Sequence, residues 1–287
     1  MKKLKIYLLL IFTLLLTGCK FNTDNMDDIS IYTTTYPINF LINELYEDHA
    51  KIYSIYPTGV NLNEYELTQR KLKDYSNSDL FIFNSLDKDR DYAVKMININ
   101  EDLKVIDVST GMNYENKVEE LWLNPNNYLM MADNIKTGLA EYIENPYLIE
   151  EINENYEKLE YDISKLTANL TETIQSAKYK TIVVDNDVFN FLKNYNLNVI
   201  SLEENDKLTT NTIDSVKSLI NNKQIKYIYT TTKTSNSVVN NLATSNNIEI
   251  IKLNDMHSVD GGITNSNDNY LTIMNNNIDL LKKELYK

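Results

Sequence analysis

The side chains that most readily bind metals or transfer protons at neutral pH are scarce in this chain. Its 287 residues include two histidines, His49 and His257, and a single cysteine, Cys19. His257 lies two residues after Asp255, just beyond an apolar segment, so the two side chains are candidates for binding a cation. A solvated loop histidine is the alternative for His257. His49 lies in a polar Glu-Asp-His turn, where we expect no functional role.

Three aspartates at alternate positions, Asp87, Asp89 and Asp91, have the spacing of a calcium-binding loop. An EF-hand loop that began at Asp87 would require glycine at its sixth position and glutamate at its twelfth. The chain has Tyr92 and Asn98 there. We therefore expect a charged surface loop rather than a calcium site.

Nothing in the sequence supports catalysis. A G-x-S-x-G elbow is missing, and two histidines are few for an ordinary hydrolase. The six glycines form no loop suited to phosphate. The formal net charge of −13 argues against a nucleic-acid partner. We expect a binding protein that is not an enzyme and does not bind nucleotides or nucleic acid.

The segment that ends at Cys19 has the composition of a secretory signal. A lysine-rich start is followed by an apolar run at 6–16 and by Thr-Gly before Cys19. The run is shorter than the ~20 residues that span a bilayer. A cysteine so placed resembles the bacterial lipoprotein signal, which implies a signal peptide at 1–18 and lipidation of Cys19. The protein would then be anchored to the bilayer on the extracytoplasmic face of the cell membrane. An ordinary secreted protein is the alternative.

Beyond a polar tether at 19–28, strand-like and helix-like segments alternate. This rhythm is typical of parallel βα units. We assign 29–145 to an N-terminal lobe. Its predicted strands are 29–34, 50–56, 80–83 and 104–108, and its predicted helices are 38–47, 68–76 and 126–143.

The middle of the chain breaks this rhythm. Apolar residues from Leu148 to Ile174 recur every three or four positions, which is the stripe of a single helix. A helix over 146–176 would be ~46 Å long. A coiled-coil strand is the alternative, but the flanking charges do not pair cleanly and the βα rhythm resumes at once. We predict one long helix lying across two lobes.

The C-terminal lobe, 177–287, repeats the alternation. Its predicted strands are 181–185, 198–202, 225–229 and 249–253, and its predicted helices are 188–195, 210–222, 237–245 and 269–285. The predicted fold is α/β, with two lobes that each contain a parallel sheet flanked by helices and are joined by one long α-helix. Ligands of such sheets bind at the carboxyl ends of the strands, so the cleft between the lobes is the expected site.

Five short segments connect the chain to a known family. They are Thr-Thr-Tyr-Pro at 34–37, Tyr-Pro-Thr-Gly-Val at 56–60, Asp-Leu-Phe-Ile-Phe-Asn at 79–84, Leu-Trp-Leu-Asn-Pro at 121–125 and the closing helix around 270–282. In this order they resemble the solute-binding lipoproteins of zinc- and manganese-type ABC importers. The resemblance implies two lobes, a metal ion in the cleft and an ABC permease as partner. We expect a monomer.

At the positions of that family's metal ligands, the resemblance assigns Asn63, Glu120, Asn186 and Asp255, with Asn254 and His257 as alternates. Two histidines cannot form the three-histidine site typical of the family. Oxygen donors suit harder ions such as manganese or calcium, whereas zinc prefers imidazole or thiolate. The implied solute is a divalent ion, manganese or zinc.

The missing histidines leave a second hypothesis open. The chain would then be a degenerate family member that binds no metal, and it would act as an accessory or surface-interaction lipoprotein or bind another solute. We expect replacement of Glu120 by alanine to abolish any cation binding. The neighbouring Glu115 and Glu119 are expected to be solvated.

Overall fold

The computed structural model describes residues 26–57, 60, 62, 64–231, 236–258 and 268–287. The predicted signal peptide, Cys19 and Asn63 lie outside these residues, as does most of the predicted tether. Within the described part of the chain, no helix is both long and apolar enough to cross a membrane.

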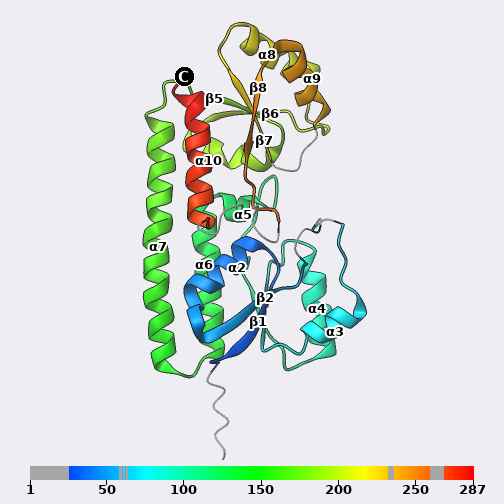
Figure 1. Ribbon diagram of the computed structural model, residues 1–287, viewed down its shortest axis with the longest axis vertical. Coiled ribbons are helices and arrows are strands. Elements are labelled where there is room, and N and C mark those ends of the chain that lie inside the picture. Colours follow the sequence, from blue (N-terminus) through cyan, green and yellow to red (C-terminus); the bar gives the residue numbers. More distant parts are fainter. Residues whose placement is uncertain (1–25, 58–59, 61, 63, 232–235, 259–267) are drawn as a thin grey trace, which may run out of the picture.

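Two parallel four-stranded sheets form the framework of the molecule (Figure 1). The first sheet has the order β2-β1-β3-β4, and the second has the equivalent order β6-β5-β7-β8. The predicted α/β fold with two sheets is therefore confirmed. The strands of the first sheet are β1 (Ile29–Thr33), β2 (Ala50–Ser54), β3 (Leu80–Phe83) and β4 (Lys104–Asp107); those of the second are β5 (Thr181–Val184), β6 (Asn198–Ser201), β7 (Tyr227–Thr231) and β8 (Glu249–Leu253).

Helices flank both sheets. Around the first sheet lie α2 (Tyr36–Tyr46), the 3₁₀ helix η1 (Glu47–His49), α3 (Gln69–Tyr75), α4 (Asp89–Ile99), the one-turn α5 (Glu120–Leu123) and α6 (Pro125–Tyr142). Around the second lie η2 (Asp187–Tyr195), α8 (Thr210–Asn221), α9 (Ser237–Asn246) and α10 (Tyr270–Leu285). The helix predicted at 188–195 is the 3₁₀ helix η2.

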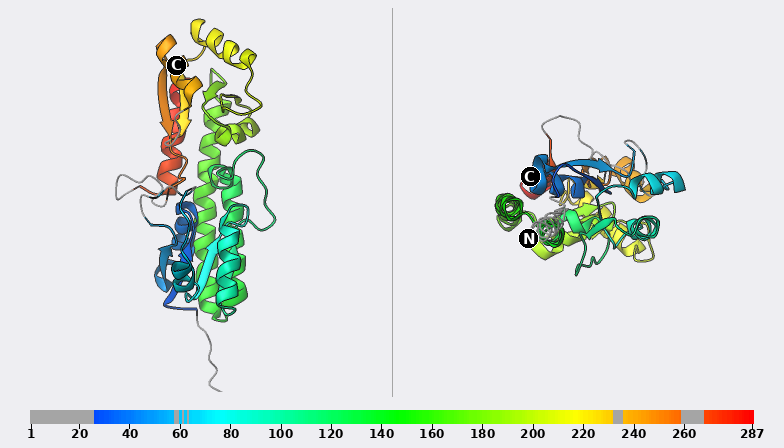
Figure 2. Two further views of the ribbon diagram at one scale, coloured as in Figure 1. Left: turned by 90° about the vertical axis from the view of Figure 1, so that its right-hand side faces the viewer. Right: turned by 90° about the horizontal axis from the view of Figure 1, so that it is seen from below.

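The predicted long helix is α7 (Pro146–Gln175), with 30 residues. Asn145 caps its start, because the Asn145 side chain accepts a hydrogen bond from the backbone N–H of Tyr147. The apolar stripe from Leu148 to Ile174 is buried and packs on α2 and α6 of the first lobe and on α10 of the second. α7 and α10 lie side by side in two perpendicular views (Figures 1 and 2). One helix thus supports both lobes.

The prediction of a charged surface loop around Asp87, Asp89 and Asp91 is wrong. Helix α4 begins at Asp89, whose side chain is buried, and the Tyr56 hydroxyl donates a hydrogen bond of 2.6 Å to its Oδ1. Acidic side chains in a first helical turn are favoured by the positive end of the helix dipole. The alternating aspartates therefore mark the start of a helix.

Candidate functional site

The inter-lobe segment, residues 115–124, follows β4 and contacts the second lobe. Its Trp122 side chain is 1% exposed. The Trp122 indole N–H donates to the carbonyl of Asp255 at 2.8 Å, and the Trp122 carbonyl accepts from the Tyr270 hydroxyl at 2.6 Å. Both partners belong to the second lobe, so these bonds hold the segment against the chain that leaves β8.

A contact between a carboxylate and an imidazole crosses the same junction. Glu119 Oε1 lies 3.0 Å from His257 Nδ1, and the two side chains are 15% and 8% exposed. Burial by itself raises the pKa of Glu119, but the hydrogen bond and the charge of His257 outweigh it, so the pKa lies below its ordinary value. Glu119 is therefore an ionised carboxylate facing the second lobe, and the expectation that it is solvated is wrong.

Glu120 points to its own segment. Its Oε1 accepts from the Asn116 side-chain amide at 2.7 Å, and its Oε2 accepts from the backbone N–H of Glu115 at 3.1 Å. The side chain is buried. These bonds give Glu120 a structural role in closing the turn at 115–120.

Two of the predicted ligands in the second lobe accept backbone hydrogen bonds. Asn186 caps η2, since its Oδ1 accepts from the N–H of Val188 at 2.9 Å. Asp255 Oδ1 accepts from the N–H of His257 at 3.2 Å. Asp255 and Asn186 are both buried. These side chains order the two turns that follow β5 and β8.

The alternate ligand Asn254 is a link between β8 and α10. Its Oδ1 accepts from the N–H of Met256 at 2.8 Å, and its own backbone N–H and carbonyl both bond to the side-chain amide of Asn277. The side chain of Asn254 therefore shapes the turn that presents Asp255 and His257.

The junction brings Glu119 into contact with His257, and Asp255 lies in the same turn as His257. No group of three or more histidine, cysteine, aspartate or glutamate side chains within the described residues is arranged to hold a metal ion. The ligand set therefore stays a prediction. Glu119 could not be found from sequence, because no periodic pattern precedes Trp122 to show which of two consecutive glutamates faces the other lobe.

Two further contacts tie the inter-lobe segment to the second lobe. Lys117 Nζ lies 2.5 Å from Glu203 Oε1, and the Tyr195 hydroxyl donates to Asn124 Oδ1 at 3.2 Å. Burial lowers the pKa of Lys117, but the hydrogen bond and the charge of Glu203 outweigh burial, so the pKa of Lys117 lies above its ordinary value. The lobes thus meet through charged and hydrogen-bonded side chains.

His49 lies away from this junction. Its Nδ1 is 2.9 Å from Asp27 Oδ1 and its Nε2 is 3.1 Å from Glu151 Oε1, so it connects the start of the described chain to α7. The hydrogen bond with Asp27 is the main cause that raises the pKa of His49.

Comparison with known proteins places the chain in a family. Residues 31–284 match the family model of ZnuA, described as zinc-uptake complex component A, periplasmic. The chain is 22% identical over 312 residues to the zinc-binding lipoprotein AdcA of Streptococcus pneumoniae, which covers 99% of the chain and 61% of AdcA. It therefore spans less than two thirds of that relative. It is 21% identical over 291 residues to the high-affinity zinc uptake system protein ZnuA of Bacillus subtilis, covering 90% of the chain and 88% of the relative.

Solved structures show the same fold. The Zn(II)-bound ZnuA-like domain of S. pneumoniae AdcA superposes with a TM-score of 0.74 at 19% identity, covering 91% of this chain and 100% of that domain. The metal-dependent lipoprotein YcdH of B. subtilis superposes with a TM-score of 0.75 at 19% identity and the same coverage. Because the family model matches nearly all of the described chain, the protein belongs to the ZnuA family of zinc-uptake complex components.

Proposed function

We propose that the chain is the solute-binding lipoprotein of a metal-type ABC importer and that its solute is a divalent cation, zinc or manganese. Acylated Cys19 would anchor it to the outer face of the cell membrane, and an ABC permease would receive the ion from the monomeric protein. Membership of a family described by zinc uptake supports this role, as does the likeness to a relative named a zinc-binding lipoprotein. The role is one of binding and delivery rather than catalysis.

The observation that carries the proposal is the buried Glu119–His257 pair between the lobes. Zinc binds imidazole nitrogen and carboxylate oxygen at about 2.0–2.2 Å in tetrahedral geometry, so two adjacent ligands of one ion lie about 3.3–3.6 Å apart. Nδ1 of His257 and Oε1 of Glu119 are 3.0 Å apart, so a separation of a few tenths of an ångström would bring them to the spacing of two zinc ligands. A cation could therefore replace their direct contact with little movement of the lobes. Asp255, Asn186, Glu120 and Asn63 are the proposed further donors.

Titration calorimetry of the full-length protein with zinc, and separately with manganese, tests the pair. We expect one-to-one binding by the wild type and a loss of affinity of at least about tenfold in both Glu119→Gln and His257→Gln, the scale seen when support for a metal is removed. Glu115→Gln changes an exposed glutamate of the same segment and should bind as the wild type does. Wild-type affinity in both junction variants would refute the assignment.

A Glu120→Gln variant tests which of the two consecutive glutamates, Glu119 or Glu120, binds the cation. Glutamine keeps an oxygen that can accept the hydrogen bond now given by Asn116 or by the Glu115 backbone. If Glu119 is the residue that binds zinc, the Glu120→Gln variant should bind zinc more tightly than the Glu119→Gln variant does. The reverse order would move the ligand to Glu120, as the family resemblance predicts.

A second function is favoured by one feature of the same pair. Glu119 and His257 already lie in contact across the junction, and this contact joins the lobes in a structure that contains no ion. A degenerate family member would use this contact as a fixed link between the lobes and would act as an accessory or surface-interaction lipoprotein. If the wild-type protein binds neither zinc nor manganese in the titration, the accessory or surface-interaction function is supported and metal transport is not.

A further inference from the structure

The turn after β8, residues 254–257, presents His257 to the inter-lobe segment, and its backbone is strained. Met256 in this turn has a φ of +53° and is fully buried. This left-handed region is unfavourable for residues that carry a side chain, and glycine is the usual residue there. Such a conformation persists where the surrounding structure enforces it, and it is frequent where ligands bind. Contacts with other elements must therefore hold Met256 in this conformation.

One side chain of α10, Asn277, holds the first residue of the turn. Its Oδ1 accepts from the backbone N–H of Asn254 at 2.9 Å, and its Nδ2 donates to the carbonyl of Asn254 at 2.8 Å. The Asn254 side chain in turn accepts from the N–H of Met256 at 2.8 Å. Asn277 is thus connected to the strained residue through hydrogen bonds with Asn254.

Asn277 lies in apolar surroundings. It is 7% exposed, and it borders a cavity of about 20 Å³ whose other described lining residues are all apolar, Leu253, Met274 and Ile278 among them. Apolar cavities stay dry, so we expect no water to take the place of the Asn277 amide. A side chain without hydrogen-bonding groups at this position would therefore leave two buried backbone groups of the turn without these partners, which is costly.

Helix α10 connects the turn to the long helix. It packs along α7, and the Asn169 side chain of α7 donates to Asn275 Oδ1 at 2.9 Å. Asn277 lies two residues later on α10. From the first lobe, the Trp122 indole donates to the carbonyl of Asp255 at 2.8 Å. The turn is therefore fixed both by α10 and by the inter-lobe segment.

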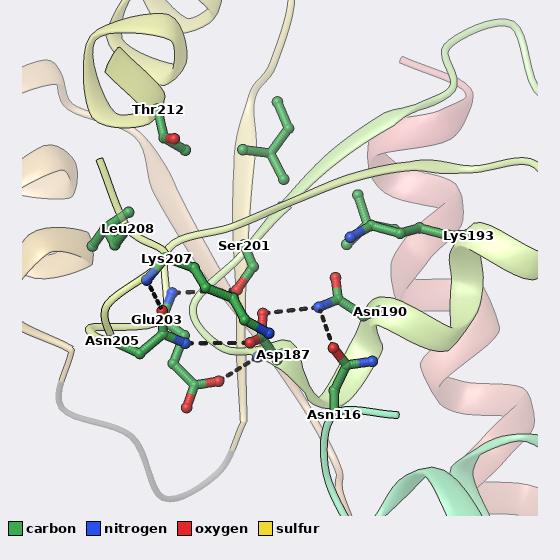
Figure 3. Close-up of a pocket in the computed structure, with 12 residues that line it drawn as sticks. Asn116, Asp187, Asn190, Lys193, Ser201, Glu203, Asn205, Lys207, Leu208 and Thr212 are labelled. Atoms are coloured by element: carbon green, nitrogen blue, oxygen red, sulfur yellow. Dashed lines mark hydrogen bonds between the residues drawn. The ribbon is translucent and has the colours of Figure 1, made fainter. Parts of the chain in front are cut away.

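The partner of His257 is held by different contacts. Glu119 lies on the inter-lobe segment, and the Asn190 side chain of η2 donates to Asn116 of this segment at 3.4 Å (Figure 3). This contact involves η2 and not α10. A change at Asn277 should therefore displace His257 and leave the inter-lobe segment in place.

We infer that Asn277 is a positioning residue for cation capture. It acts through the turn at 254–257, which it holds in the conformation that brings His257 to Glu119, and not by contact with the cation. Its bonds to Asn254 thereby set the affinity of the junction. The inference rests on the proposed function, because the quantity that Asn277 controls is cation affinity.

Two measurements on full-length Asn277→Leu test this role, since leucine is similar in size and cannot bond the Asn254 backbone. Calorimetry should show a loss of zinc affinity of at least about tenfold, the scale seen when support for a metal ligand is removed. In NMR spectra of the metal-free protein with isotope-labelled histidine, the imidazole signals of His257 should shift and those of His49 should not. The chain has two histidines, so the spectrum of His257→Gln assigns them.

Asn275→Leu is the matched control. Asn275 lies on the same helix and bonds to Asn169 and to the carbonyl of Leu271, so this variant should keep wild-type His257 signals and zinc affinity. If Asn277→Leu does not fold, Asn277→Ser replaces it, because a serine side chain is too short to bond both backbone groups of the turn.

Wild-type zinc affinity or wild-type His257 signals in the Asn277 variant would overturn the inference. A wild-type protein that binds no zinc would refute the proposed function instead. In that case the His257 signals alone decide whether Asn277 fixes the turn, so the two failures are distinguishable.

Discussion

Replacing Trp122 with alanine should lower the free energy of unfolding by about 3–5 kcal/mol, the usual cost of removing a large buried aromatic side chain. Trp122 is 1% exposed and contacts both lobes, and its indole N–H is the donor to the buried carbonyl of Asp255. The variant would open a cavity at the junction and leave that carbonyl without this donor. Urea unfolding of the full-length protein measures the change.

Two further variants show which part of Trp122 matters. Trp122→Phe keeps an aromatic ring but loses the N–H that donates to the Asp255 carbonyl, so it should cost about 0.5–1.5 kcal/mol, the net contribution of one hydrogen bond. Tyr161→Ala removes an aromatic side chain that is 65% exposed on α7 and should change the stability by less than about 0.5 kcal/mol. A Trp122→Ala protein as stable as Tyr161→Ala would show that the junction does not hold the lobes together.

Replacing Asp89 with asparagine should remove a pH dependence of stability between about pH 4 and pH 6. Burial raises the pKa of Asp89 from 3.8 to about 6, although the hydrogen bond from Tyr56 lowers it. The folded state therefore binds more protons than the unfolded state in this window, and stability falls as the pH rises through it. A shift of about two pKa units corresponds to about 3 kcal/mol.

The measurement is urea unfolding of both proteins across this pH range. The asparagine side chain of the variant stays neutral, so the stability of Asp89→Asn relative to wild type should rise by about 1–3 kcal/mol from pH 4 to pH 7. Asp91→Asn changes an exposed aspartate in the same turn of α4 and is the matched control. If the curves of stability against pH are parallel for the wild type and Asp89→Asn, burial does not raise the pKa of the Asp89 carboxyl.

The elements predicted best are those whose pattern is local. The stripe of α7 and the apolar strands of both sheets can be read from the spacing of hydrophobic residues alone. Helix α4 escapes prediction because its charged first turn has the same spacing as a calcium loop, and only the burial of Asp89 distinguishes them. The helix predicted at 188–195 agrees with η2 in extent, but the spacing of its apolar residues does not show that it is a 3₁₀ helix.

The candidate site depends on contacts between distant parts of the chain, which spacing cannot supply. The resemblance predicts Glu120, yet the structure directs Glu119 to His257 and Glu120 to Asn116. Which of the two glutamates faces His257 depends on the rotation of the short helix α5 about its axis, and a shift by one residue would exchange them. His257 could be noted from its place after β8, but its partner could not, because the two lie in different lobes.

The most direct test of the account is X-ray absorption at the zinc K edge on the full-length protein loaded with less than one equivalent of zinc. Capture at the junction predicts an imidazole nitrogen and carboxylate oxygens at about 2.0–2.2 Å, with the imidazole signal lost in His257→Gln. A spectrum without imidazole, or one unchanged in His257→Gln, would contradict the assignment of the junction as the cation site.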